Sequence, residues 1–206
     1  SSDLGKNYRI IPNAIDVEKF KKNISIRESL RKEFGFEGKK VIGHVGRFHF
    51  QKNHKFLLEI FSELVKKSDD YRLLLVGQGE LESKIRQIAK RKKVLDKVKF
   101  CGVREDVEKI YQAMDVFVLP SVSEGLGIVA LEAQANLLPC LIADTVPHIV
   151  KVNDNVIFLS LNENATTWAN CIEKMMKNDI LIENKMVTSE YNIEVQVKKF
   201  EESLFE

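Results

Sequence analysis

Short apolar runs alternate with helix-like segments along this chain, and this alternation constrains its fold more than any other feature of the sequence. Each run is rich in Val, Ile, Leu or Phe, as expected of a parallel strand that is buried on both faces of a sheet. The predicted strands are Tyr8–Ile11, Val41–Gly46, Leu73–Val76, Val98–Cys101, Val116–Leu119, Pro139–Ala143 and Val156–Leu159.

The segments between the runs carry helical patterns. Helices are predicted at Ile26–Phe34, His54–Lys67, Glu80–Lys92 and Glu105–Ala113, from Leu126 onward, and from Glu163 to the end, where Ile193–Phe205 forms a second run. Strands that alternate with helices predict an α/β fold, a doubly wound parallel sheet of about six strands in a Rossmann-like arrangement. No linker rich in Pro, Gly or Ser divides the chain, so residues 1–206 are expected to form one domain.

The charge and apolar content of the chain argue against binding to nucleic acid and against a membrane-spanning segment. The chain has 32 Lys and Arg against 30 Asp and Glu, a net charge of +2, which does not favour binding to nucleic acid. No apolar run approaches the ~18 residues that span a bilayer, and no signal peptide opens the sequence.

Cys101, Cys140 and Cys171 are far apart and odd in number, and each has apolar neighbours. We therefore expect buried free thiols and a reducing, cytoplasmic compartment.

The stretch Pro120–Glu132, PSVSEGLGIVALE, joins a predicted strand to a predicted helix. Glu124, Gly125 and Gly127 lie where the strand passes into the helix, at the carboxyl edge where open α/β sheets bind ligands. The unpaired backbone N–H groups at the start of a helix, together with its dipole, favour an anion there. The stretch therefore predicts a site for phosphate and sugar groups.

Two glutamates, Glu124 and Glu132, flank this site. If the residues between them were all helical, the glutamates would lie about 12 Å apart along the axis, too far for the paired carboxylates of a glycosidase. They could instead contact different parts of one extended ligand. The alternative is that Glu132 is a solvated helix residue and Glu124 a partner of the helix dipole. The apolar neighbours of Glu132 argue against it, because a carboxylate in such a helix should face a cleft or have a hydrogen-bond partner.

Arg47 and Lys52 follow the predicted strand Val41–Gly46, again at the carboxyl edge of the sheet. Two cations near a helix N-terminus could bind a diphosphate, although Arg and Lys are also common on any surface. Gly43 and Gly46 favour the binding interpretation, because glycine lets a ligand approach the backbone closely.

Other patterns have plainer interpretations. Gly77-Gln78-Gly79 lacks the third glycine of a dinucleotide-binding fingerprint and is interpreted as a tight turn between a strand and a helix. The basic run Lys90–Lys93 ends a predicted helix and is expected to be solvated, with contact to anionic lipid as the alternative. The spacing of His44, His49 and His54 matches no metal-binding motif, so no metal site is predicted.

Together these residues resemble the C-terminal domain of the family-four retaining glycosyltransferases of the GT-B fold, which include bacterial capsule and exopolysaccharide transferases. The most specific match is the E-x7-E signature of that family, which Glu124 and Glu132 provide in full context. The matching segments are IIPNAID (Ile10–Asp16), GHVGRFHFQKN (Gly43–Asn53), LLLVGQGELE (Leu73–Glu82), VKFCGVREDV (Val98–Val107) and MDVFVLPSVSEGLGIVALEAQANLLPCLIADT (Met114–Thr145).

The resemblance implies roles in holding a nucleotide sugar. Arg47 and Lys52 match the cations that hold the donor's diphosphate, Glu124 matches the glutamate that faces the donor sugar, and Glu132 matches the glutamate that binds the ribose hydroxyls. The remaining implied binding residues contribute mainly backbone groups. They are Gly46 beside the cations, Gly125, Leu126, Gly127, Ile128 and Val129 for phosphate and sugar oxygens, and Val103 and Arg104 for the nucleobase edge.

The reaction that the resemblance implies is transfer of a sugar from a nucleotide diphosphate, UDP by default, with retention at the anomeric carbon and without a required metal. The sequence departs from the family pattern at Thr145–His148 and at Asn136–Pro139, which leaves the donor sugar open.

Members of this family carry an N-terminal domain that binds the acceptor, a glycan or a lipid-linked molecule. The resemblance implies that this chain begins at the interdomain connection, so we expect a donor-binding half that binds nucleotide but turns over little alone. Its expected location is the cytoplasm, with contact at the inner face of the membrane as a further possibility. Two alternative functions stay open, half of a nucleotide-sugar epimerase and a non-catalytic α/β interaction module.

Overall fold

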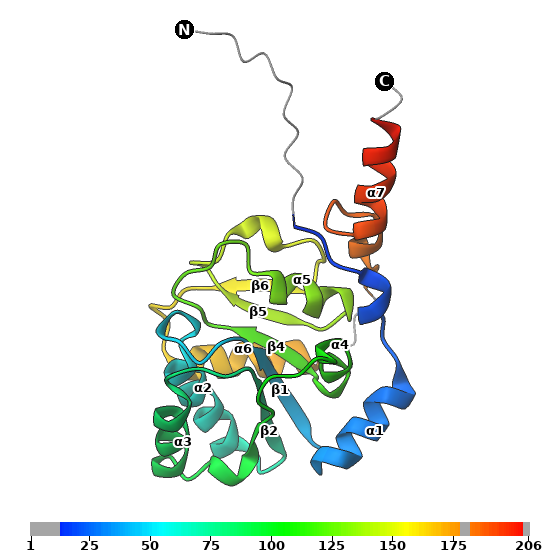
Figure 1. The fold of residues 1–206 in the computed structure, drawn as a ribbon. Coiled ribbons are helices and arrows are strands. Elements are labelled where there is room, and N and C mark those ends of the chain that lie inside the picture. Colours follow the sequence, from blue (N-terminus) through cyan, green and yellow to red (C-terminus); the bar gives the residue numbers. More distant parts are fainter. Residues whose placement is uncertain (1–12, 178–181, 204–206) are drawn as a thin grey trace, which may run out of the picture.

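Six parallel strands form one twisted sheet in the order β3-β2-β1-β4-β5-β6 (Figure 1). The computed structural model describes residues 13–177 and 182–203. The strands are β1 (Lys40–Val45), β2 (Tyr71–Val76), β3 (Val98–Phe100), β4 (Val116–Leu119), β5 (Cys140–Ala143) and β6 (Val156–Leu159). The predicted doubly wound parallel sheet is therefore confirmed, and the predicted strand Tyr8–Ile11 lies outside the described residues.

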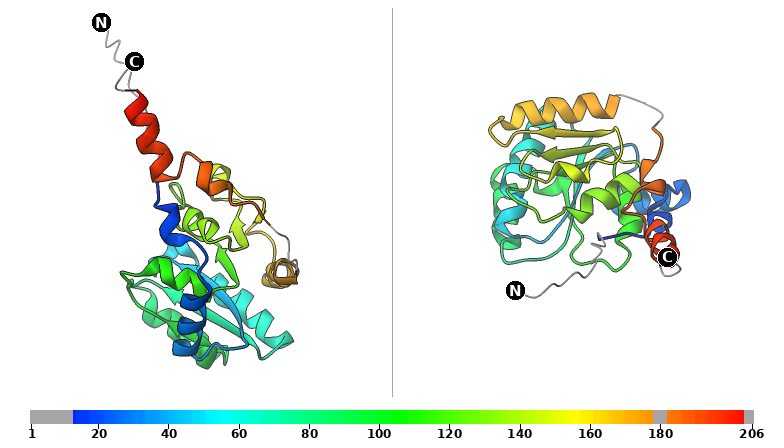
Figure 2. Two further views of the ribbon diagram at one scale, coloured as in Figure 1. Left: turned by 90° about the vertical axis from the view of Figure 1, so that its right-hand side faces the viewer. Right: turned by 90° about the horizontal axis from the view of Figure 1, so that it is seen from above.

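Two layers of helices cover the sheet. The helices are α1 (Ile24–Phe34), α2 (His54–Lys67), α3 (Glu82–Arg91), α4 (Val107–Ile110), α5 (Ile128–Ala135), α6 (Ala165–Lys177) and α7 (Ile193–Glu202). Short 3₁₀ turns complete the chain at η1 (Val17–Phe20), η2 (Phe50–Lys52), η3 (Leu95–Lys97), η4 (Tyr111–Ala113), η5 (His148–Val150) and η6 (Lys185–Thr188). Helix α2 packs against α3 and α6 in one layer, while α1, α4 and α5 are linked through η1 and η4 in the other. The view from above in Figure 2 shows strands lying between α6 and α5.

The last helix, α7, extends away from the sheet (Figure 1). Its start is joined to the first described residues, because the Ile15 amide donates to the Tyr191 carbonyl at 2.8 Å and the Ile193 amide donates to the Ile15 carbonyl at 3.0 Å. Among residues 13–177 and 182–203, no helix has both the length and the apolar character required to cross a bilayer.

The cysteine prediction is correct for only one thiol. Cys140 is buried in β5, but Cys101 and Cys171 are half-buried. Cys101 follows the edge strand β3, and Cys171 lies on the outer layer helix α6, so each keeps a side toward solvent. Burial raises the pKa of the Cys140 thiol far above its usual range, which makes it unreactive.

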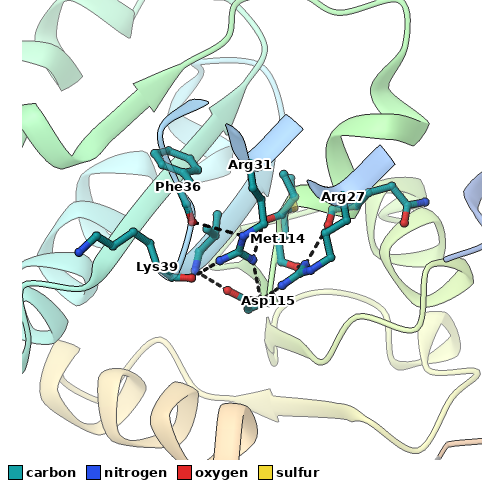
Figure 3. Close-up of polar contacts among 9 residues, drawn as sticks. Arg27, Arg31, Phe36, Lys39, Met114 and Asp115 are labelled. Atoms are coloured by element: carbon teal, nitrogen blue, oxygen red, sulfur yellow. Dashed lines mark hydrogen bonds and ion pairs between the residues drawn. The ribbon is translucent and has the colours of Figure 1, made fainter. Parts of the chain in front are cut away.

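Asp115, just before β4, joins α1 to the sheet (Figure 3). One of its carboxylate oxygens accepts hydrogen bonds from Arg27 and, at 3.0 Å, from Nη1 of Arg31. The other oxygen accepts from the backbone amide of Val41 at 2.7 Å, at the start of β1. Arg31 is buried and donates further to the Phe36 carbonyl at 3.3 Å. The network therefore pairs two guanidinium groups with one carboxylate and fixes the amino ends of β1 and β4.

A pair of histidines is buried between the sheet and α2. The rings of His44 on β1 and His54 on α2 meet edge to face with centroids 4.7 Å apart, and Phe48 stacks on His54 at 4.3 Å. Nδ1 of His44 lies 2.9 Å from the Val118 carbonyl oxygen, so this nitrogen carries the proton. Within the described part of the chain, Nε2 of His44 and both ring nitrogens of His54 have no hydrogen-bond partner. Burial lowers the pKa of His44 to about 4 and that of His54 to about 2, so both rings are neutral at pH 7.

We expect Asp115→Ala to lower the free energy of unfolding by about 3 kcal/mol, because it leaves the buried Arg31 without its counter-charge. Denaturant unfolding measures the loss. Asp154→Ala is the control, since it breaks an exposed pair with Lys185 and should cause no measurable change. Equal stability of the two variants would contradict a structural role for the Asp115 network.

Acid should destabilise the domain through the histidine pair. The folded-state pKa of His44 lies below its ordinary value of 6.5, so the unfolded state binds more protons between these two values. The stabilisation is complete above pH 6.5 and is lost as the pH falls toward 4. We expect a loss of about 1 kcal/mol per histidine per pH unit in this range, measured by denaturant unfolding. His54→Phe keeps the stacking on Phe48 and should remove about half of the dependence; an unchanged pH profile would contradict this origin.

Candidate functional site

The candidate site lies at the carboxyl edge of the sheet, where β1 and β4 are neighbours. From β1 the chain passes through α2 to β2, and from β4 it passes through α5 to β5, so it winds in opposite directions from this junction. Such a switch point leaves a crevice between the loops that follow the two strands, which is where open α/β sheets bind ligands. Most of the predicted site residues lie in these two loops or in α5, whereas Val103 and Arg104 lie in the loop after β3.

A cleft of about 970 Å³ opens at this edge, a size typical of small-molecule sites. Its walls come from the ends of β1 and β2, the loops that follow β1, β2 and β3, the first residues of α3 and α4, and the first turns of α5. The lining residues are Val45, Gly46, Arg47, Val76, Gly77, Gln78, Gly79, Glu82, Val103, Arg104, Val107, Val129 and Glu132. The structure therefore brings six predicted site residues into one cleft: Gly46, Arg47, Val103, Arg104, Val129 and Glu132.

The inner side of the cleft is built from backbone. The Gly77 amide donates to the Gly102 carbonyl at 2.8 Å, and the Phe48 amide donates to the Gln78 carbonyl at 3.0 Å, so the loops after β1, β2 and β3 are joined. Gly77 has a φ of +131°, and a Cβ there would lie 2.2 Å from the Gly46 carbonyl oxygen. A Cβ at Gly79 would lie 2.5 Å from the Phe48 carbonyl oxygen. The predicted tight turn is confirmed, and it also lines the cleft, which the sequence interpretation did not include.

Glu132 lies on α5 and is half-buried at the cleft wall. Its Oε2 accepts a 2.7 Å hydrogen bond from the hydroxyl of Tyr111, a fully buried residue of η4. Burial raises the pKa of Glu132, and the Tyr111 hydrogen bond acts in the opposite direction. The expectation that a carboxylate in this apolar helix has a cleft or a partner is confirmed on both counts.

Arg47 and Arg104 are the two guanidinium groups at the cleft, and each has a carboxylate partner. Arg47 is 72% exposed and lies 3.4 Å from Glu80, a contact that contributes little to stability and leaves the side chain available to a ligand. Arg104 holds Asp106 in a two-pronged pair at 2.8 and 2.9 Å, and this hydrogen bonding lowers the pKa of the Asp106 carboxyl.

Lys52 and Glu124 form a separate, more buried ion pair beside the cleft. The Lys52 ammonium lies 2.6 Å from the Glu124 carboxylate, with side chains 18% and 12% exposed. Glu124 also accepts a 2.6 Å hydrogen bond from the Ser121 hydroxyl. A Cβ on Gly46 would lie 3.0 Å from the Lys52 stem, so this pair adjoins the cleft at Gly46. Arg47 and Lys52 therefore have different carboxylate partners.

The helix predicted to start near Leu126 starts two residues later. Helix α5 begins at Ile128, because Gly127 has a φ of +80° and ends the preceding turn. Glu124, Gly125 and Leu126 therefore lie in a turn before the helix, and the helical spacing assumed for Glu124 and Glu132 does not apply. No side chain caps α5 at Gly127; the Ala130 amide donates to the Gly127 carbonyl at 2.8 Å, whereas the amides of Ile128 and Val129 stay available to an acceptor. Helix α3 likewise begins at Glu82, which leaves Glu80 in the turn.

The loops around the cleft are joined by hydrogen bonds that the sequence did not reveal. The Val122 amide donates to the Gln51 carbonyl at 2.7 Å, which joins the loop after β4 to the loop after β1. The Thr145 hydroxyl donates to the Ser121 carbonyl at 2.6 Å. Asn136 is buried and donates to the Phe20 carbonyl at 2.8 Å. Two residues of the unusual segments Thr145–His148 and Asn136–Pro139 therefore have structural roles.

Sequence reasoning missed Tyr111, Glu80 and Ser121, the partners of Glu132, Arg47 and Glu124. Tyr111 and Glu80 lie far along the chain from the residues they contact, and no periodicity connects them. Only the rule that a buried carboxylate needs a partner pointed to a residue like Tyr111. Among the residues that the structure describes, no three His, Cys, Asp or Glu side chains gather closely enough to hold a metal ion.

Comparison with known proteins gives the family. The model of the family described as glycosyl transferases group 1 matches residues 26–194. EpsF of Bacillus subtilis, which is named as a glycosyltransferase, is 36% identical over 171 residues, covering 82% of this chain and 44% of EpsF. The Escherichia coli UDP-Gal:alpha-D-GlcNAc-diphosphoundecaprenol alpha-1,3-galactosyltransferase is 29% identical over 205 residues, covering 94% of this chain and 52% of that protein. The chain spans about half the length of these curated relatives.

Solved structures share the fold. HepE from Anabaena, solved in complex with UDP and glucose, superposes with a TM-score of 0.79 at 20% identity, covering 95% of this chain and 56% of HepE. The C-terminal domain of the group 1 glycosyl transferase LpcC from Francisella tularensis gives 0.68 at 19% identity, covering 91% of this chain and 98% of that domain. With the match over residues 26–194, the chain therefore belongs to the group 1 glycosyl transferase family and has the α/β fold of GT-B enzymes.

Proposed function

We propose that this chain is the donor-binding domain of a retaining glycosyltransferase, which holds a nucleotide diphosphate sugar while the sugar passes to a glycan or a lipid-linked acceptor. The observation that carries the proposal is the composition of the cleft. A half-buried carboxylate, an exposed guanidinium and the first turn of an uncapped helix line one cavity at the switch point of the sheet.

Glu132 is the proposed receptor of the ribose. Its Oε1 receives no hydrogen bond from the described residues, although Oε2 is held by Tyr111. The two neighbouring hydroxyls of a ribose are donors that would stabilise this half-buried charge. Val103, a residue that is 63% exposed and lines the cleft, and Arg104 would lie along the nucleobase, with their backbone groups at its edge.

The diphosphate would lie between the start of α5 and the cations. The amides of Gly125–Val129 supply donors and the positive end of the helix dipole, and Gly46 lets the phosphates approach the backbone. Arg47 and Lys52 would stabilise the negative charge that grows on the leaving diphosphate, a role that metals have in other enzymes, so no metal is required in this proposal. Glu124 would face the donor sugar, held in place by Lys52 and Ser121.

UDP is the proposed nucleotide. Two relatives support this choice: HepE was solved with UDP, and the Escherichia coli relative is named for a UDP-Gal donor. The acceptor would be bound by a further, N-terminal domain that closes the cleft. Alone, the chain would bind nucleotide but transfer little sugar, because an open half-cleft neither excludes water nor positions an acceptor.

Calorimetric titration with UDP, GDP and ADP should give binding heat for at least one nucleotide, with UDP the first expectation. Glu132→Ala should weaken that binding by about 1–3 kcal/mol, because it removes the acceptor of the ribose hydrogen bonds. Glu173→Ala is the matched control, since Glu173 also accepts from a buried tyrosine, Tyr71, but lies on α6 away from the cleft.

Each alternative function predicts a different result. Absence of heat with all three nucleotides would favour a non-catalytic interaction module. An equal loss of affinity from Glu132→Ala and Glu173→Ala would contradict the ribose assignment. Epimerised nucleotide sugar, formed by the whole protein without an acceptor, would identify an epimerase instead.

We also propose a cytoplasmic location with peripheral contact at the inner face of the membrane. The basic run Lys90–Lys93 ends α3, and its Lys90, Arg91 and Lys93 are exposed without an ion-pair partner among the described residues. Replacing these three by Ala should weaken co-sedimentation with phosphatidylglycerol vesicles at low salt by about tenfold or more. Replacing Lys19, Lys21 and Lys22 by Ala is the control of equal charge; an equal effect of both triple variants would contradict a specific contact through α3.

A further inference from the structure

The hydroxyl of Tyr111 is placed as a support for Glu132. Tyr111 is fully buried in η4, and its ring packs on Phe20 and Phe117 at centroid distances of 5.7 and 5.9 Å. Its hydroxyl lies 2.7 Å from Oε2 of Glu132 and 3.2 Å from the Val129 carbonyl oxygen. A hydroxyl has one proton, and the charged acceptor at the shorter distance is the stronger partner.

The two oxygens of the Glu132 carboxylate are therefore unequal. Oε2 accepts the hydrogen bond from Tyr111. Oε1 has no hydrogen-bond partner among the described residues, and it is not a buried atom. Because Glu132 lines the cleft, Oε1 is the oxygen that stays free to accept a hydrogen bond from a ligand there. A glutamate side chain has several rotamers, and the Tyr111 hydrogen bond selects the one with this orientation.

We propose that Tyr111 is a positioning residue, which fixes the Glu132 carboxylate so that a bound ribose is recognised by its two neighbouring hydroxyls. This inference rests on the proposed nucleotide-sugar function and adds to it a residue that touches no ligand. In this proposal, the preference for a ribonucleotide over a deoxynucleotide depends on the buried Tyr111 hydroxyl, which contacts Glu132 and not the ligand.

The charge of Glu132 depends on the same hydrogen bond. Burial raises its pKa, and the hydrogen bond from Tyr111 lowers it. Tyr111 therefore helps to keep the carboxylate ionised at the cleft wall, and an ionised carboxylate only accepts hydrogen bonds. Two hydroxyl donors on adjacent ribose carbons complement such an acceptor, whereas a protonated carboxyl would compete as a donor.

The test is the discrimination between UDP and its 2′,3′-dideoxy analogue, measured by calorimetry on the native chain, on Tyr111→Phe and on Tyr71→Phe. Tyr111→Phe keeps the ring packing on Phe20 and Phe117 and removes only the hydroxyl. Tyr71→Phe is the matched control, because Tyr71 is also buried and its hydroxyl donates to a glutamate, Glu173, at 3.3 Å outside the cleft.

We expect Tyr111→Phe to weaken UDP binding about fivefold or more while leaving the dideoxy analogue unchanged, so that the ratio of the two affinities falls. Tyr71→Phe should leave this ratio as in the native chain. If Tyr111→Phe does not fold, Glu132→Asp is the second variant. It keeps the negative charge but moves the carboxylate away from Tyr111 by one methylene group. The ratio of the UDP affinity to the dideoxy-analogue affinity should fall again.

A ratio that Tyr111→Phe leaves unchanged, whether both ligands weaken equally or neither does, would overturn the positioning role. It would leave the proposed function intact as long as the native chain binds UDP. A native chain that binds neither nucleotide would instead overturn the proposed function itself, and the inference with it.

Discussion

The carboxylate of Asp115 is the contact on which the arrangement of this domain depends, because it controls how β1 and β4 meet. These strands share only two aligned residue pairs, so their pairing is short for the central junction of a sheet. Asp115 reinforces it by accepting from the Val41 amide while two arginines of α1 neutralise its charge. At the opposite end of the same strands, the loops that follow β1 and β4 lie beside the candidate site and are joined by the hydrogen bond from the Val122 amide to the Gln51 carbonyl. The charge network at the amino ends of β1 and β4 therefore fixes the alignment of the two strands, and with it the relative position of the loops that follow them at the cleft.

Most of the fold could be predicted from the sequence, because the strands of a parallel sheet are buried on both faces and are therefore short apolar runs. The helix His54–Lys67 and the strands Val116–Leu119 and Val156–Leu159 have the predicted bounds. The errors occur where backbone conformation departs from the local pattern, as at Gly127, whose left-handed φ delays α5 to Ile128. Residues of a site can be assigned to an edge of a sheet from sequence, whereas their partners are set by packing between distant segments. Tyr111 and Glu132 show this, since they meet only because η4 and α5 cover the same face.

The charges at the site are arranged in pairs rather than as free cations. Lys52 is held by Glu124 in a nearly buried pair, while Arg47 lies beside Glu80 at the surface. The first pair is rigid because both side chains are enclosed, and Ser121 adds a further hydrogen bond. The second can open at little cost, because water replaces the contact. The chain thus combines one enclosed cation, Lys52, with one exposed cation, Arg47, near Gly46, an arrangement suited to a ligand whose charge changes during a reaction.

The backbone that forms the inner side of the cleft limits how this protein can be modified. At Gly77 and Gly79 no side chain can be introduced without moving the neighbouring carbonyl groups, so libraries randomised there would mostly sample damaged folds. Val103 is exposed and Arg104 is half-buried beside Asp106, and neither side chain takes part in the hydrogen bonds that join the loops, so variation there leaves the joined loops intact. Substitutions that change ligand preference, whether engineered or evolved, are therefore expected in the loop after β3 and not at the two glycines.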